Sequence, residues 1–245
     1  MNRERFRFFQ CSQMETDLLI GVPPDQFNNG LERTALAETH RVREVIETYA
    51  EAHPGFYTAL QPLQRSKENR PGKEKEKVPA EIETMLHCAE LSGTGPMSSV
   101  AGLVAGSVGH RLLMEYNLSE VVIENGGDLY LRCMQDTLAV IQAGDSALSG
   151  KLGLNIPAGS WGICTSSGTV GHSFSFGKAD AVTVLCESAP LADAWATSLA
   201  NRVHTSADID PVLALTEKIP DILGCVVVIG DRVGIRGQFE LKPLT

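Results

Sequence analysis

Long apolar segments are absent from this 245-residue sequence. A membrane-spanning helix needs a run of about 18 apolar residues, and no such run occurs. Residues 1–9 alternate charged and apolar side chains, and they lack the apolar core of a signal peptide. We therefore expect a protein with no membrane anchor and no secretory leader, and we expect it in the cytoplasm.

Closely paired cysteines and an excess of positive charge are also absent. No CxxC pair supports a zinc or thioredoxin-like site, so we expect reduced, mostly buried thiols at Cys11, Cys88, Cys133, Cys164, Cys186 and Cys225. The formal net charge of −9 argues against a general nucleic-acid-binding protein. It leaves room for an anionic ligand, because main-chain N–H groups and a metal ion bind phosphate without basic side chains.

The apolar pattern favours an α+β fold. Helical spacing predicts helices over 30–52, 79–90, 100–117, 189–203 and 210–218. Residues 6–8 and 16–22 predict an opening β-hairpin. Further β-rich runs predict strands over 121–124, 129–133, 138–143, 161–165, 181–187, 225–229 and 233–235. Because strands and helices do not alternate regularly, we expect mostly antiparallel sheets packed with helices. The charged segment near 64–78 predicts a solvated, mobile loop.

The predicted helix over 100–117 has one side nearly free of side chains, with glycine at 102, 106 and 109. Each glycine costs about 1 kcal/mol of helix stability relative to alanine, so their number implies a reason. Either this helix packs closely against a neighbour, or a ligand approaches its backbone.

The segment Leu191–Leu199 places a carboxylate and a hydroxyl on one face of a predicted helix. Asp193 and Thr197 are four residues apart and therefore lie one above the other. Ser188 as a cap and Pro190 in the first turn support the helix. Two hard oxygens directed at one point suit Mg²⁺ or Ca²⁺. The alternative is an ordinary alanine-rich packing helix with Asp193 near its positive N-terminus.

Three further segments carry groups that bind phosphate or move protons. Residues 124–128 read Glu-Asn-Gly-Gly-Asp, a hairpin turn whose glycines let a ligand approach the backbone. Residues 164–169 supply hydroxyls and main-chain N–H groups, and His172 has a ring able to donate a hydrogen bond or move a proton. Taken singly, a turn, a serine-rich loop and a core histidine explain these segments equally well.

In this order and spacing, the four segments resemble the ApbE family of flavin-binding proteins. The family has a Gly-Gly-Asp turn, then a Thr-Ser-Gly loop, then a histidine and an Ala-Asp-Ala-x-Ala-Thr motif, which here ends at Thr197. The resemblance is clear from about Leu91 to Val203. It implies an ApbE-like, T-fold-like domain of the α+β class over 1–245, with two interleaved lobes as the alternative.

Typical members of the family are Mg²⁺-dependent FAD:protein FMN transferases. The resemblance thus implies FAD or a related flavin nucleotide as ligand, a protein acceptor, and Mg²⁺ held by Asp193 and Thr197. The residues that it implies for flavin binding are Gly126, Gly127, Asp128, Thr165, Ser166, Ser167, Gly168 and His172.

The chain departs from the family pattern in two motifs and in the interval between the Gly-Gly-Asp turn and the Thr-Ser-Gly loop, which is short here. The family's His-x-x-Asp-Pro motif is replaced by His172 followed by Ser-Phe-Ser-Phe, and the Lys-Gly and Asp of the small-residue helix match Ala105-Gly106 and His110. With these departures, the chain most resembles the uncharacterised protein family 0280, a divergent branch of the ApbE-like superfamily. Loss of the lysine removes a charge of the kind that stabilises negative charge during transfer chemistry.

Three functions are therefore open. The chain is either a nucleotide-binding protein that transfers a phosphate-containing group, or a non-catalytic binding or accessory protein on the same fold. The third function is a hydrolase with Cys164 or Ser166 as nucleophile and His172, His110 or His204 as base, although no G-x-S-x-G elbow occurs. Exposed strand edges also make a homodimer plausible.

Overall fold

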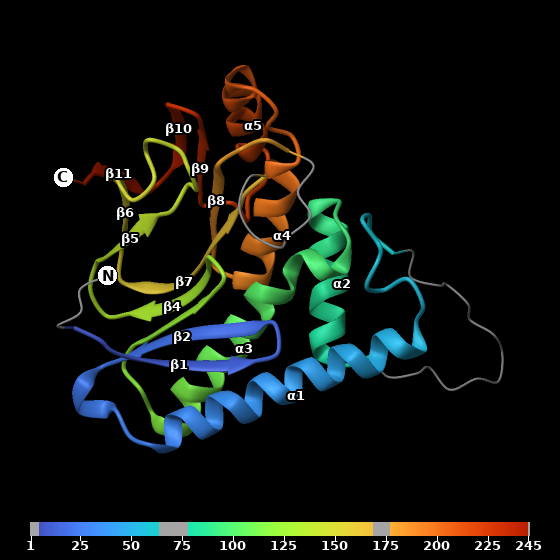
Figure 1. Ribbon diagram of the computed structural model, residues 1–245, viewed down its shortest axis with the longest axis vertical. Coiled ribbons are helices and arrows are strands. Elements are labelled where there is room, and N and C mark those ends of the chain that lie inside the picture. Colours follow the sequence, from blue (N-terminus) through green and yellow to red (C-terminus); the bar gives the residue numbers. More distant parts are fainter. Residues whose placement is uncertain (1–4, 64–77, 169–176, 245) are drawn as a thin grey trace.

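The computed structural model describes residues 5–63, 78–168 and 177–244, and its central feature is a large antiparallel sheet (Figure 1). Its eight strands lie in the order β1-β2-β3-β4-β7-β8-β9-β10. They are β1 Arg7–Gln13, β2 Thr16–Val22, β3 Val121–Asn125, β4 Asp128–Cys133, β7 Gly159–Ser166, β8 Ala181–Cys186, β9 Gly224–Ile229 and β10 Arg232–Gly237. Every neighbouring pair is antiparallel, which confirms the expected α+β class.

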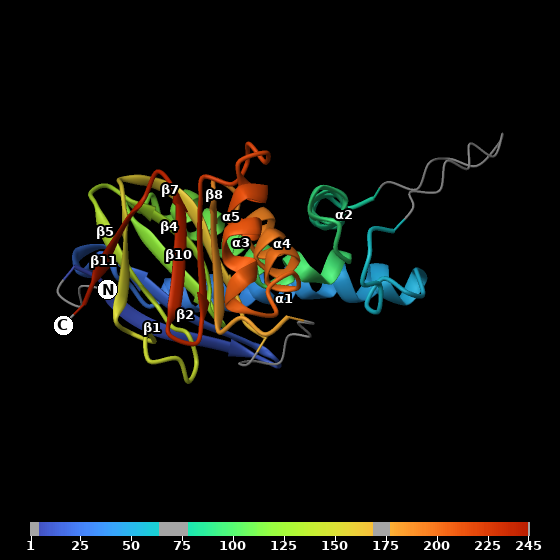
Figure 2. The ribbon, with the colours of Figure 1, turned by 90° about the horizontal axis from the view of Figure 1, so that it is seen from above.

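A second sheet of three strands lies over one face of the first and has the order β11-β6-β5. Its strands are β5 Thr137–Ile141, β6 Leu152–Ile156 and β11 Glu240–Pro243. The opposite face carries the helices, as Figure 2 shows. These are α1 Gly30–Ala52, α2 Ala80–Ser92, α3 Val100–Tyr116, α4 Ala189–Ala200 and α5 Ile209–Thr216.

The strands alternate their side chains between these two layers. On β3, Val121 and Ile123 join the core formed with α1 and α3, whereas Val122 joins the core under the three-stranded sheet. On β9, Val227 packs with α4 and α5, and Val226 faces the small sheet. The two-residue period of the strands thus builds a core on each face of the large sheet.

Most predicted elements are present, and two strands were missed. α1 has the predicted bounds, and the other helices begin and end within a few residues of prediction. Strands β6 and β11 were not predicted, and they pair with each other at the edge of the small sheet. The predicted charged loop over 64–77 and His172 lie outside the described residues.

Close packing explains two glycines of α3. A Cβ at Gly102 would lie 2.4 Å from the main-chain oxygen of Ala189 on α4, and one at Gly109 would lie 2.2 Å from the Tyr130 ring on β4. At Gly106 the nearest such atom is Pro190 Cδ, at 3.9 Å. The small residues therefore bring α3 against both α4 and the sheet, as the first of the two explanations requires.

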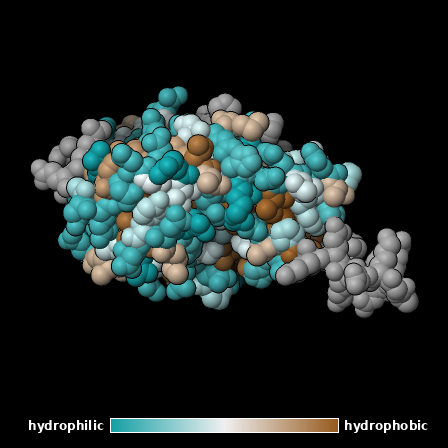
Figure 3. Space-filling model, turned by 90° about the horizontal axis from the view of Figure 1, so that it is seen from below, coloured by the Kyte–Doolittle hydropathy of each residue, from teal (hydrophilic) through white to brown (hydrophobic). Residues whose placement is uncertain are grey.

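The described helices are too short or too polar to span a membrane. Within residues 5–63, 78–168 and 177–244, no helix has both the length and the apolar character needed to cross a membrane. The face in Figure 3 is mostly hydrophilic, with apolar residues in small separate groups. All six cysteines are free and buried, as expected for structural thiols.

Candidate functional site

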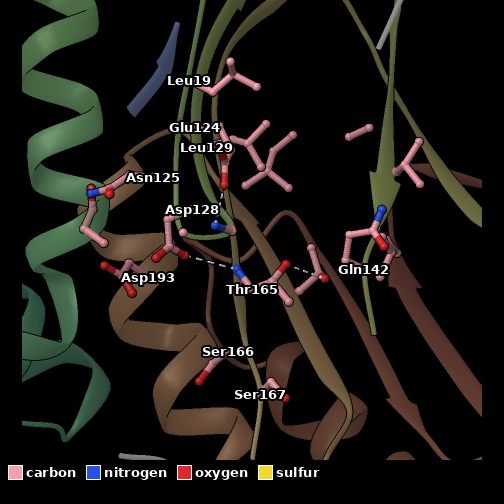
Figure 4. A pocket seen from close by; sticks show the side chains of 18 of the residues that line it. Leu19, Glu124, Asn125, Asp128, Leu129, Gln142, Thr165, Ser166, Ser167 and Asp193 are labelled. Atoms are coloured by element: carbon pink, nitrogen blue, oxygen red, sulfur yellow. Dashed lines mark hydrogen bonds between the residues drawn. The ribbon is translucent and has the colours of Figure 1, made fainter. Parts of the chain in front are cut away.

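A cavity of about 600 Å³ lies at one end of the central strands of the large sheet. It connects the side that carries the small sheet with the side that carries the helices. It begins between the two sheets, passes the β3–β4 turn and the end of β7, and reaches the side of α4 (Figure 4). This volume is within the usual range for small-molecule sites. The cavity therefore has walls from segments that are far apart in the sequence.

Most of the predicted site residues line this one cavity. They come from three motifs: Gly126, Gly127 and Asp128; Thr165, Ser166 and Ser167; and Asp193 with Thr197. Gly168 is absent from the lining and packs instead against Gly177, whose oxygen would be 2.1 Å from a Cβ at position 168. The fold thus brings together motifs that the sequence could only place in order.

The Gly-Gly turn is held in one conformation by local bonds. Gly126 and Gly127 have φ of 63° and 103°, the left-handed region that favours glycine in a two-residue hairpin turn. The Gly127 N–H donates to Glu124 Oε1 at 2.8 Å, and the Thr165 N–H donates to Asp128 Oδ1 at 3.2 Å. These bonds fix the Asp128 carboxylate beside the end of β7.

Asp193 lies against the N-terminus of a neighbouring helix, not that of its own. Its Oδ2 accepts a hydrogen bond from the Gly102 N–H at 2.9 Å, in the first turn of α3. Pro190 lies in the first turn of α4 and Ser188 is its N-cap residue, both as predicted, although the Ser188 side chain makes no capping hydrogen bond. The positive end of α3 favours the ionised form of Asp193.

Burial opposes ionisation of both Asp193 and Asp128. Asp193 and Asp128 are 9% and 8% exposed. Burial raises the pKa of Asp193 to about 7, although the N–H groups of Gly102 and Ala101 lower it. Burial and the negative charge of Asp193 raise the pKa of Asp128 well above its ordinary range. Two carboxylates that repel each other in a buried site form a favourable place for a cation.

The remaining surface of the cavity has a hydroxyl-bearing side and an apolar end. Thr165 Oγ1 and Thr183 Oγ1 share a hydrogen bond at 2.9 Å, next to Ser166 and Ser167. The apolar end is formed by the large sheet, through Phe8, Leu19, Val122, Leu129 and Ile163, and by the small sheet, through Ala139, Val140, Ile141 and Leu154. A ligand with a charged part and a flat apolar part fits this division.

The described lining carries acidic side chains and no lysine, arginine or histidine. The acidic residues are Glu15, Glu124, Asp128, Asp180 and Asp193. Across residues 5–63, 78–168 and 177–244, no group of three or more histidine, cysteine or acidic side chains gathers as a metal cluster. A cation here would therefore use two carboxylates at most, together with hydroxyl oxygens, water or ligand oxygens.

Several lining residues had no sequence signal. Glu15, Gln142 and Asp180 come from a hairpin turn and loops that match no motif. The contact between α3 and Asp193 did have a signal, because glycine at 102 admits α4 closely enough for its N–H to reach the carboxylate.

Comparison with known proteins now identifies the family. A model of the family described as AbpE bacteria matches residues 1–225. The UPF0280 protein of Methanococcus aeolicus is 36% identical over 235 residues, which cover 94% of this chain and 89% of that protein. The chain belongs to the UPF0280 group of the ApbE-like superfamily. The UPF0280 protein of Methanothermobacter thermautotrophicus is 35% identical over 245 residues, covering 96% of this chain and 90% of the relative.

Solved structures show the same fold in ApbE proteins. The flavin transferase ApbE from Vibrio cholerae superposes with a TM-score of 0.54 at 15% identity, covering 94% of this UPF0280 chain and 96% of the other. The ApbE protein from Thermotoga maritima gives a TM-score of 0.56 at 14% identity, with coverages of 95% and 97%. The superpositions establish the shared fold alone, because a common fold does not imply a common function.

Proposed function

We propose that this UPF0280 protein binds a flavin nucleotide such as FAD together with Mg²⁺ and transfers its FMN part to an acceptor protein in the cytoplasm. One observation carries the proposal: Asp128, Asp193 and Thr197 meet the Gly-Gly turn and the Thr-Ser-Ser segment at the end of β7 in one cavity. The fold is that of proteins named flavin transferases. A general binding cleft would not require two buried carboxylates at its polar end.

The donor set fits Mg²⁺. Asp193, Asp128 and Thr197 offer hard oxygens, and Mg²⁺ commonly binds through one or two carboxylates while water and substrate phosphates complete its coordination. The repulsion between the two buried carboxylates gives a bound cation a direct energetic benefit. Bound Mg²⁺ would neutralise phosphate charge and polarise a phosphoryl oxygen.

The chain's own groups would orient the nucleotide. The backbone at Gly126 and Gly127 admits a close approach, and the hydroxyls of Thr165, Ser166 and Ser167 lie within reach of the same polar end. The apolar end between the two sheets would hold a ring of the nucleotide. Gly168 and His172 keep their predicted ligand roles as proposals only.

A non-catalytic carrier or accessory protein is the second candidate, and one observation favours it. The described lining supplies no basic side chain to stabilise the charge of a transferred phosphoryl group. His110, at the position where the family has an acidic residue, directs Nδ1 to the main-chain oxygen of Gly106 at 2.7 Å and packs on Tyr130. Homodimer formation stays a prediction.

The hydrolase alternative receives less support from the geometry. Cys164 is fully buried, and its Sγ donates to the main-chain oxygen of Ala189 at 3.3 Å. Burial and the nearby charge of Asp128 raise the pKa of this thiol well above its ordinary range, which disfavours the thiolate that a nucleophile needs.

Calorimetric titration of FAD tests the proposal. We expect binding by wild type in MgCl₂, and a loss of at least tenfold in EDTA or with Asp193→Asn. Asp231→Asn, at a carboxylate that is 87% exposed in the β9–β10 turn, is the matched control and should bind as wild type does. Equal FAD affinity for wild type and Asp193→Asn in MgCl₂ would refute the metal assignment.

Release of AMP separates the two candidates. A transferase supplied with FAD, Mg²⁺ and a competent acceptor yields AMP and an FMN-modified protein, detected as a mass increase of the acceptor. A protein that binds FAD but yields neither product with any acceptor from its own proteome is a carrier.

A further inference from the structure

The cavity runs along the edge of strand β5 and not along one of the strand's faces. The lining includes four consecutive residues, Ala139, Val140, Ile141 and Gln142. Side chains of consecutive strand residues point to opposite faces, so all four border one cavity only if that cavity runs along the strand's edge. In the described part of the chain β5 pairs with β6 alone and is the last strand of its sheet.

The hydrogen bonds around Ile141 show which main-chain groups face that edge. The Gly150 N–H donates to the Ile141 oxygen at 3.0 Å, on the β6 side of the strand. The Ala143 N–H likewise donates to Ser149 Oγ at 2.9 Å on that side. Main-chain groups alternate between the two edges of a strand, so Val140 and Gln142 direct theirs to the free edge.

The free edge borders an apolar slot that is wide enough to be solvated. Val140 is 38% exposed and Leu19, on the opposite wall, is 36% exposed. Leu19, Val122 and Leu129 offer a flat apolar surface from the large sheet. A planar ring resting on that surface would bring its edge to the main-chain N–H and C=O of Val140.

We propose that the free edge of β5 binds the edge of the ligand's heterocycle through the N–H and C=O of Val140. This inference rests on the proposed function, since it assigns the ring-binding part of the same nucleotide site. One strand residue offers a donor and an acceptor side by side, which matches the donor–acceptor edge of both flavin and adenine rings. The shared chemistry is therefore a planar heterocycle with adjacent N–H and acceptor groups.

Proline at position 140 tests the N–H directly. Val140→Pro removes a donor that faces away from β6, so the ladder to β6 keeps its bonds, whereas Val140→Ala trims the side chain and keeps the donor. The probes are FMN, which carries the flavin ring alone, ADP, which carries adenine alone, and inorganic pyrophosphate, each titrated with MgCl₂. We expect Val140→Pro to weaken FMN or ADP by about three- to tenfold, with pyrophosphate unchanged and Val140→Ala within twofold of wild type.

The outcomes distinguish this inference from the proposed function. The probe that loses affinity identifies the ring at the β5 edge. If wild type binds FMN or ADP and Val140→Pro binds both equally well, the inference is refuted and the proposed function stands. If wild type binds neither of these nucleotides nor FAD, both fall. If it binds FAD alone, Val140→Pro is compared with wild type in FAD titrations, and equal affinity refutes the inference. Should the proline variant fail to fold, amide exchange of wild type decides: the Val140 N–H must exchange more slowly with FMN or ADP bound, and an unchanged rate refutes the inference.

Discussion

Asp193→Asn should stabilise the metal-free protein while removing its response to Mg²⁺. Burial raises the pKa of Asp193 from an ordinary value of about 3.9 to about 7, so the folded state resists ionisation of this group. Each pKa unit corresponds to about 1.4 kcal/mol, which sets an upper limit of about 4 kcal/mol at pH 8. The raised pKa already includes the opposing effect of the α3 N–H groups. Asparagine keeps an oxygen for the Gly102 N–H but buries an NH₂ group, which costs about 1–3 kcal/mol where it finds no acceptor.

The net gain is therefore about 1–3 kcal/mol, or an increase in Tm of about 3–10 °C for a chain of this size. Thermal unfolding in EDTA at pH 8 measures it. The sign depends on pH: a carboxylate with a raised folded-state pKa costs no stability below about pH 4, and its cost grows as pH rises to about 7. The gain must therefore shrink as the pH is lowered from 8 to 4.5. A lower Tm for Asp193→Asn at pH 8, or a gain that does not vary with pH, would refute this reasoning.

Three further predictions follow from the same site. The affinity for Mg²⁺ alone should fall at least tenfold per pH unit below pH 7, because the metal displaces the proton of Asp193 and the pKa of Asp128 is raised as well; an affinity that is constant from pH 5.5 to 8 in calorimetry would be inconsistent with it. Gly102→Ala should lower the unfolding free energy by about 1–3 kcal/mol, since its Cβ meets Ala189 at 2.4 Å, whereas Gly106→Ala, with 3.9 Å to Pro190, should raise it by about 0.5–1 kcal/mol. Equal effects in urea unfolding would disprove the packing argument. Iodoacetamide should leave Cys164 unmodified and FAD affinity unchanged in the native protein, and rapid alkylation with loss of binding would reopen the hydrolase alternative.

Local sequence signals predicted the elements that local forces determine. The apolar period of α1 and the Asn-Gly-Gly-Asp turn between β3 and β4 each fix their own structure, so both lie where they were expected. β6 was missed because Gly153 and the following Pro157 are typical of loops. Strand β6 forms because β5 pairs with one of its edges and β11, which is distant in the sequence, pairs with the other. A local sequence pattern does not reveal such long-range pairing.

The candidate site was predictable where it carries motifs and not elsewhere. Asp193 and Thr197 share a helix face as their spacing requires, and the Gly-Gly-Asp and Thr-Ser-Ser segments meet them. Ser188 is the N-cap of α4 as expected but makes no side-chain capping bond. The N–H group that Asp193 accepts comes from Gly102 on α3, and the spacing of residues within α4 could not predict that contact. The β5 edge had no signal, since its contribution comes from the backbone and any apolar residue serves there.

The proposed metal site between Asp193, Thr197 and Asp128 can be located directly in crystals of the intact protein. Crystals grown with FAD and MnCl₂, a cation with anomalous scattering that takes the same oxygen ligands, would locate the metal without reference to activity. We expect an anomalous peak at bonding distance from the side-chain oxygens of Asp193 and Thr197, next to Asp128. A bound nucleotide with no peak there, or with its metal held elsewhere, would contradict this expectation.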